Sequence, residues 1–134
     1  MGIVVQKFGG TSVANEESRA RLVAKVIEAR HDGKDVVVVV SAMGRKPAPY
    51  ATDTLLDLVE SVCLAAPPRE RDAIAACGET ISTVIVAAAL EAAGCPAVSL
   101  TGAQAGISTD SSFTDARITK IEPRRILEVL SDGK

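Results

Sequence analysis

A lysine, two glycines and two hydroxyl residues follow the first apolar run of this 134-residue sequence, in the stretch QKFGGTS at positions 6–12. Glycines let backbone N–H groups approach a phosphate closely, and a lysine adds a positive charge. The order differs from a Walker A loop, in which the lysine follows the second glycine and is itself followed by Ser or Thr. A glycine pair alone is also typical of a tight turn, so both interpretations stay open on these residues.

Three more residues are candidates for chemistry, and each also has an ordinary structural explanation. Ser41 follows five consecutive valines, and its hydroxyl could bond a nearby backbone group. Thr52 is typical of a helix N-cap, although a helix start also offers N–H groups to a carboxylate. Glu79 lies in CGET among small and apolar residues. There it either stabilises a helix start or serves as a carboxylate that holds an ammonium group or orients a lysine.

The first elements of the chain predict how two of these residues meet. We expect a strand over 3–8, a helix that begins after Asn15 and stops at Gly33, and a strand over 35–42. Such a crossover is right-handed and makes the strands parallel, so Lys7 and Ser41 leave the sheet at the same edge. Ligands of open α/β sheets bind at that edge. The unbroken valines predict that the second strand is buried on both faces.

The rest of the chain continues the alternation of helices and strands. We expect a loop over 44–51 and a helix over 52–65, capped by Thr52 and followed by a break at Pro67 and Pro68. Two helices then cover 69–77 and 78–93, the second buried on most sides. A third strand is expected over 96–100, and two short strands within 105–109 and 116–121. A last helix has Pro123 at its start and Gly133 at its end.

Composition limits the class of protein. The chain is 47% hydrophobic but only 2% aromatic, so one domain with an aliphatic core is expected. A net charge of -2 and the lack of a basic patch argue against nucleic acid. No leader-like segment and no apolar stretch of roughly 18 residues is evident, which predicts a cytoplasmic protein without a membrane partner. An odd number of cysteines without a CxxC pair predicts reduced thiols.

Five motifs in order point to a known family. VVQKFGGTSV, VVVVVSAMG, TDTLL, CGETIS and LTGAQAGISTD resemble the N-terminal half of bacterial aspartate kinases, and FTDARI continues the match. The resemblance covers essentially the whole chain. It implies an α/β protein with the three-layer α/β/α amino-acid kinase fold and a mostly parallel sheet. Residues 1–134 would form the N-terminal, amino-acid-binding part of the catalytic domain, and the ATP-binding half and ACT regulatory domains would lie beyond it.

The resemblance also implies a reaction and a set of site residues. Aspartate kinases phosphorylate the β-carboxylate of L-aspartate with ATP to give 4-phospho-L-aspartate, the first step toward lysine, threonine and methionine, and Mg²⁺ accompanies the ATP. Catalytic roles would fall to Lys7 and Glu79. ATP phosphate would meet Lys7, Phe8, Gly9, Gly10 and Ser12, and L-aspartate would meet Ser41, Thr52 and Glu79. No residue is expected to bind a metal. Phosphoryl transfer needs positioning and charge neutralisation rather than a protein nucleophile, which fits these residue types.

The resemblance also implies that the chain alone is inactive, since the family's adenine pocket lies outside it, and that the full-length protein is a homo-oligomer. Two other interpretations remain. The chain could instead be a non-catalytic half-protein that binds aspartate or pairs with a partner, and an open sheet edge would favour self-association. It could also be a sister kinase acting on glutamate, acetylglutamate, carbamate or UMP, although CGETIS and QAGISTD argue against this.

Overall fold

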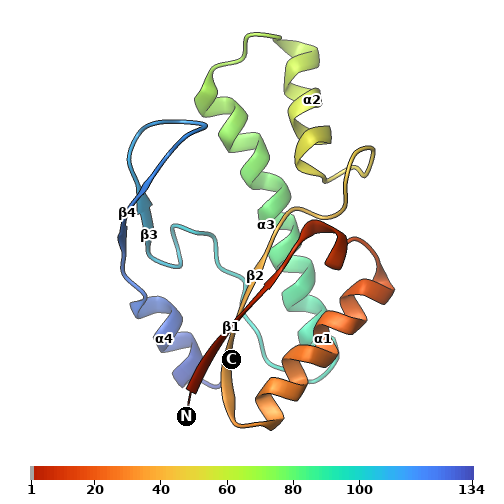
Figure 1. The fold of residues 1–134 in the computed structure, drawn as a ribbon, viewed down its shortest axis with the longest axis vertical. Helices are drawn as coiled ribbons and strands as arrows, with labels where there is room; N and C mark the ends of the chain where they lie inside the picture. Colours follow the sequence, from red (N-terminus) through yellow and green to blue (C-terminus); the bar gives the residue numbers. More distant parts are fainter. Residues whose placement is uncertain (1) are drawn as a thin grey trace.

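A computed structural model describes residues 2–134, and its elements alternate along the chain (Figure 1). In order they are β1 (Gly2–Phe8), the short 3-10 helix η1 (Gly10–Ser12), α1 (Glu16–His31), β2 (Lys34–Val40), α2 (Thr52–Val62), α3 (Pro68–Ala92), β3 (Ile107–Thr109), β4 (Ile118–Ile121) and α4 (Arg124–Ser131). β1 and β2 pair in parallel, and β3 and β4 form a separate antiparallel pair. The chain therefore has an α/β architecture with a parallel sheet.

The β1–α1–β2 unit forms as predicted. In the parallel register Lys7 lies opposite Val39 and Phe8 opposite Val40, so both strands end at the same edge. The Asn15 side chain accepts a hydrogen bond from the N–H of Ser18 at 2.8 Å, which satisfies one of the free donors at the start of α1. After the helix, Gly33 adopts a φ of +73° and turns the chain into β2.

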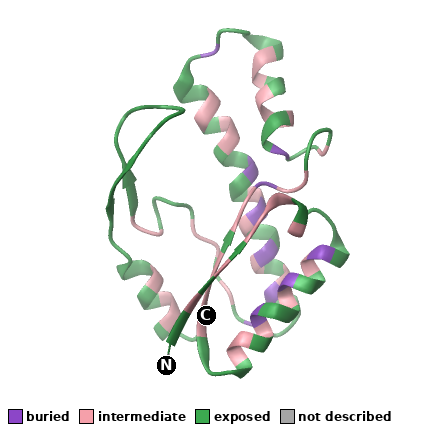
Figure 2. Ribbon diagram, viewed as in Figure 1, coloured by how far each residue is buried: buried purple, intermediate pink, exposed green. Residues whose placement is uncertain are grey.

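An aliphatic core fills the space between α1, α3 and one face of the β1–β2 pair. Figure 2 shows the buried residues concentrated on these two helices and on the loops near the strand ends. Alternate strand residues point into this core because side chains on a strand alternate between its faces. The buried cluster consists of Val13, Leu22, Val26, Val86, Leu90 and Cys95, with Phe8, Val36, Val38 and Val40 packed against it.

The opposite face of the sheet differs from the prediction for the valine strand. Val39 is 44% exposed, and on β1 the side chains of Ile3 and Val5 are 52% and 63% exposed. Within residues 2–134, β1 has a strand neighbour only on the side of β2. The valine run is therefore buried on one face rather than two, because the described residues leave much of the other face uncovered.

The two helices predicted over 69–77 and 78–93 are one continuous helix, α3. Gly78 lies inside it, so the expected boundary there is wrong, whereas the break at Pro67 and Pro68 is confirmed. Burial follows a single stripe with a spacing of four residues: Gly78, Ser82, Val86 and Leu90. Val84 and Ile85 are exposed, so the prediction that this helix is buried on most sides is also wrong.

Two smaller predictions fail locally. Ala51, not Thr52, occupies the cap position of α2, and Thr52 is the first helical residue with no side-chain capping bond. The segment 96–100 is not a strand, because it forms no ladder of hydrogen bonds with a neighbour. It is held instead by the core contact of Ala97 and by the Ala97 N–H, which donates to the Glu91 carboxylate at 2.8 Å.

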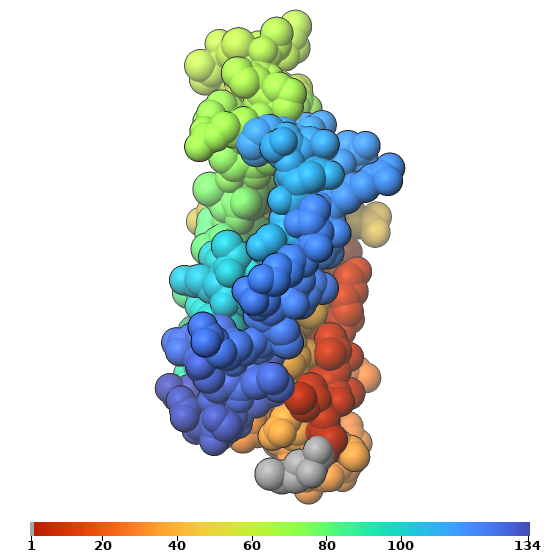
Figure 3. Space-filling view, turned by 90° about the vertical axis from the view of Figure 1, so that its left-hand side faces the viewer, coloured from red at the N-terminus to blue at the C-terminus, as the bar shows by residue number. Residues whose placement is uncertain are grey.

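The last third of the chain forms the predicted hairpin and helix. Figure 3 shows these residues spread along one side of the molecule, from the hairpin loop beside α3 down to α4. The Asp72 carboxylate accepts a bond from the N–H of Thr114 at 2.8 Å, which ties the hairpin loop to the beginning of α3. At the other end, the Arg30 guanidinium donates to the carbonyl of Gly133 at 2.9 Å.

One described helix, α3, is long and apolar enough to cross a membrane by length and composition alone. This differs from the expectation that no apolar stretch would reach that length. A single such helix is weak evidence, because core helices of soluble proteins have the same property. The stripe of α3 from Gly78 to Leu90 packs in the protein, where the helix contacts α1, α2 and β2.

We expect the chain to self-associate through the outer side of β1, since an uncovered strand edge with apolar side chains pairs readily with another chain. Val5→Lys should shift the mass measured by light scattering toward the monomer, because lysine opposes edge pairing. Val62→Lys makes the same change on α2, where the side chain is 85% exposed, and should leave the mass unchanged. A monomer at all concentrations in the parent chain would contradict the prediction.

Candidate functional site

The loops that follow β1 and β2 touch at the carboxyl edge of the sheet. The N–H of Gly44 donates to the carbonyl of Gly10 at 2.9 Å. A Cβ placed on Gly10 would lie 2.5 Å from the carbonyl oxygen of Ala42, closer than real Cβ atoms come to any neighbour. Glycine is therefore required at position 10 for the two loops to meet in this way.

Helix α3 reaches the same point from the other side. A Cβ on Gly78 would lie 3.1 Å from the Cβ of Ala42 and 2.8 Å from the carbonyl oxygen of Tyr50. Ala42, which is buried, thus contacts both the glycine loop and the middle of α3. We call this arrangement of Gly10, Ala42 and Gly78 the Ala42 contact. It brings the residues next to it in sequence, Ser41 and Glu79 among them, to one edge of the sheet.

The phosphate side of the candidate site presents groups that suit an anion. Lys7 is exposed and makes no ion pair within the described residues 2–134. A Cβ on Gly9 would meet no atom within 4 Å, so the space next to this glycine is open. Among the same residues, the N–H groups of Gly10 and Thr11 find no acceptor. A free ammonium group and free N–H donors fit a phosphate.

Two other residues predicted to meet phosphate have one group each that is engaged within the protein. The side chain of Phe8 packs against the core, so only its backbone faces the loop region. The N–H of Ser12 donates to the carbonyl of Gly9 at 3.0 Å and closes the 3-10 turn. The Ser12 hydroxyl is therefore the group of that residue left for a ligand.

The acceptor side contains hydroxyls and a carboxylate. Ser41 is half-buried at the end of β2, and Thr52 is exposed at the first position of α2. Glu79 is exposed well inside α3, so the interpretation that it stabilises a helix start is wrong. Its carboxylate makes no ion pair within residues 2–134. An unpaired carboxylate can hold an ammonium group, and hydroxyls can donate to a carboxylate.

The loop between β2 and α2 also carries a cation, but that cation is already paired. The Lys46 ammonium forms an ion pair with the carboxylate of Asp57 on α2. The hydrogen bond to Asp57 is the main cause that raises the pKa of Lys46, and its charge adds to the effect. Both side chains are exposed, so the pair fastens the loop to α2 without burying charge. Lys7 is therefore the better candidate for a phosphate.

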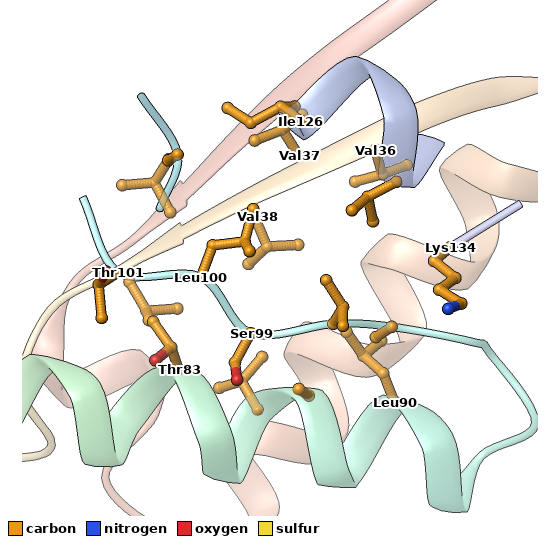
Figure 4. A pocket seen from close by; sticks show the side chains of 18 of the residues that line it. Val36, Val37, Val38, Thr83, Leu90, Ser99, Leu100, Thr101, Ile126 and Lys134 are labelled. Carbon is orange, nitrogen blue, oxygen red and sulfur yellow. The ribbon is translucent and has the colours of Figure 1, made fainter. Parts of the chain in front are cut away.

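An apolar hollow lies next to the strand ends. A cavity of about 430 Å³ separates β2 from α3 and the segment 95–102, and Figure 4 shows mainly aliphatic side chains around it. Glu79 contributes to its wall, but Lys7, Ser41 and Thr52 do not. An apolar hollow does not suit phosphoryl transfer between charged molecules, so we place the candidate site at the strand ends rather than in this cavity.

Sequence reasoning missed the residues that bring the site together. Ala42 and Gly78 have no chemistry of their own, and only their close approach in the structure reveals them. Thr54, in the TDTLL stretch, is also absent from the predicted set. Its hydroxyl is buried and has no hydrogen-bond partner among the described residues. The only sign of Thr54 in the sequence was its place in the TDTLL stretch, as the second threonine after Thr52.

Comparisons with known proteins agree with the geometry. The sequence pattern of the amino acid kinase family matches residues 2–134. Aspartokinase 1 of Bacillus subtilis (strain 168) is 48% identical over 132 residues, which are 98% of this chain and 33% of that protein. The aspartokinase of Mycobacterium tuberculosis (strain ATCC 25618 / H37Rv) is 45% identical over 134 residues, 100% of this chain and 31% of its own length.

A solved structure matches in the same way. The crystal structure of aspartate kinase from Synechocystis has a TM-score of 0.81 and 34% identity, covering 99% of this chain and 21% of that one. This match supports the predicted amino-acid kinase fold. The chain spans about a third of the length of the two curated relatives.

The two glycines of the loop should respond differently to the same change. Gly10→Ala should lower the free energy of unfolding by about 1–3 kcal/mol, because the new methyl group forces the Ala42 carbonyl away. Gly9→Ala is the control: its φ of -75° suits any residue and its surroundings are open. It should change the free energy by less than about 1 kcal/mol. Urea denaturation measures both, and equal effects would contradict the structure.

Proposed function

The chain belongs to the amino acid kinase family, and we propose that it carries the acceptor side and one phosphate loop of an aspartate kinase. The observation that supports the proposal is the Ala42 contact, in which the glycine loop, the loop after Ser41 and the part of α3 that precedes Glu79 meet. The aspartokinases among its relatives support L-aspartate as the acceptor. The proposed product is 4-phospho-L-aspartate, the first intermediate toward lysine, threonine and methionine.

The proposed reaction moves one phosphoryl group. An oxygen of the L-aspartate β-carboxylate forms a bond to the γ-phosphorus of ATP, and the bond from that phosphorus to its bridging oxygen breaks. ADP leaves with the electron pair. The transferring group carries negative charge throughout, so catalysis depends on cations and N–H donors placed around it.

The residues divide between the two substrates. Lys7 neutralises charge on the transferring phosphoryl group, and the loop of Gly9 and Gly10 donates N–H groups to phosphate. Ser41 and Thr52 bind the carboxylates of L-aspartate, and Glu79 binds its ammonium group. Binding both negative substrates next to each other would align the acceptor carboxylate with the phosphoryl donor.

Mg²⁺ would accompany the ATP phosphates and neutralise part of their charge. Within residues 2–134, no group of three or more His, Cys, Asp or Glu residues is placed to hold a metal. We therefore assign no residue of this chain as a metal ligand. The chain itself supplies a lysine, hydroxyls, a carboxylate and backbone donors to the proposed reaction.

Two alternatives differ from this proposal, one in catalysis and the other in the substrate. The uncovered edge of β1 favours a non-catalytic half-protein that pairs with another chain. Such a protein could bind aspartate and still catalyse nothing. A sister kinase would prefer glutamate, acetylglutamate, carbamate or UMP, and the aspartokinases among the relatives favour aspartate over these.

The proposal predicts that the chain binds L-aspartate. Titration followed by ¹⁵N NMR should shift the amide signals of residues 41, 52 and 79, with a smaller response to L-glutamate. Glu79→Gln should weaken binding about tenfold, because a charged partner of the ammonium group is lost. Glu70→Gln changes another exposed carboxylate of α3 and should leave the affinity unchanged.

Either of two results would contradict this assignment. No response to L-aspartate would remove the acceptor from the proposal, and equal losses in both glutamate variants would remove Glu79 from it. We expect no ADP formation from ATP and L-aspartate by the 134-residue chain alone. Turnover by that chain would show that it needs no further segment for catalysis.

A further inference from the structure

Gly78 is an unusual residue for the middle of a long helix. Glycine there costs about 1 kcal/mol relative to alanine, because it loses more backbone freedom on folding. Its neighbours in α3 are mostly alanine, threonine and branched aliphatic residues, which lose less backbone freedom on folding than glycine does. A glycine at this position is therefore expected only where a side chain would not fit.

The surroundings of Gly78 leave no room for one. A Cβ would lie 2.8 Å from the carbonyl oxygen of Tyr50, 2.8 Å from Cδ1 of Leu55 and 3.1 Å from the Cβ of Ala42. The leucine methyl group can move, but the Tyr50 oxygen belongs to the backbone. An added methyl group must therefore push α3 away from the loop that precedes α2.

The atoms that crowd Gly78 belong to neighbours of the proposed aspartate ligands. Ala42 directly follows Ser41, Tyr50 lies just before Thr52, and Leu55 lies in the first turn of α2. Glu79 follows Gly78 itself. The packing of α3 on this loop thus sets the separation between the backbone that carries Glu79 and the backbone that carries Ser41 and Thr52.

We propose that Gly78 is a positioning residue for amino-acid binding. Because it has no side chain, α3 packs directly on the loop between β2 and α2, and this packing sets the separation of Glu79 from Ser41 and Thr52. The proposal rests on the proposed function, because it takes those three residues as the ligands of L-aspartate. Gly78 itself touches no substrate. Its effect is transmitted through the backbone carbonyl of Tyr50 and the methyl group of Ala42.

Gly78→Ala tests this inference. The variant should shift the ¹⁵N–¹H amide signals of residues 41–44 and 50–53 and weaken L-aspartate binding about tenfold, since small displacements of binding groups are costly. If the glycine affected only the helix itself, alanine would raise the stability of α3. The amide signals of these residues and the affinity for L-aspartate would then stay unchanged. That result would overturn the inference.

A matched control separates positioning from general stability. Val86→Ala, two turns further along the same buried stripe, opens a small space in the core and lowers stability. It should leave the amide signals of 41–44 and 50–53 and the affinity for L-aspartate unchanged. Equal loss of affinity in both variants would mean that any destabilisation of α3 disturbs the site, and would contradict a specific role for Gly78.

Two further outcomes keep the inference separate from the proposed function. If the parent chain does not respond to L-aspartate, the proposed function fails, while the amide signals still show whether Gly78 positions the loop. If Gly78→Ala does not fold, the double variant Gly78→Ala/Leu55→Ala removes the Leu55 contact and keeps the one with the Tyr50 carbonyl. Unshifted signals over 50–53, relative to Leu55→Ala alone, would then overturn the inference.

Discussion

The close contact of Gly10, Ala42 and Gly78 is the constraint on which the site depends. Ala42 lies in the loop after β2, and the two residues that approach it, Gly10 and Gly78, must be glycine for the backbones to come this close. The contact joins segments that are distant in sequence: the loop after the first strand, the loop after the second and the middle of the long helix. Backbone packing therefore holds these three segments together, rather than hydrogen bonds between the candidate side chains that they carry.

This arrangement explains why the candidate side chains can remain free. Lys7 and Glu79 make no ion pairs within the described residues, and the hydroxyls at the end of β2 and the start of α2 lie at the surface or near it. Free charged groups at a binding site are available to ligands without first breaking an internal contact. The cation that is paired, Lys46, instead fastens the loop to α2 through Asp57. In the proposed function, structural and ligand-binding roles thus fall to different lysines.

Sequence patterns predicted local structure well where the determining interactions are local. The cap at Asn15, the turn at Gly33 and the parallel crossover all follow from short-range signals. The boundary at Gly78 was wrong because the tertiary contact with Ala42 and Tyr50 outweighs the helix-breaking tendency of one glycine. The strand at 96–100 failed because a strand needs a hydrogen-bonded neighbour, which its own composition cannot supply.

The same limit applies to burial and to the site. Five valines indicate a strand, but whether its second face is covered depends on other elements, and here Val39 stays 44% exposed. The edge shared by Lys7 and Ser41 followed from the crossover rule alone. A place for Glu79 in the same site could be inferred only from resemblance, since nothing near it in sequence reveals that Gly78 packs on the loop after β2.

The most direct test of the proposed site is to locate L-aspartate on the chain by intermolecular NOEs to its β-methylene protons. We expect cross-peaks to residues 41, 52 and 79, around the Ala42 contact. Cross-peaks to Val38 and Leu100 in the apolar cavity instead, or to neither set at saturating L-aspartate, would contradict the assignment of the site to the strand ends.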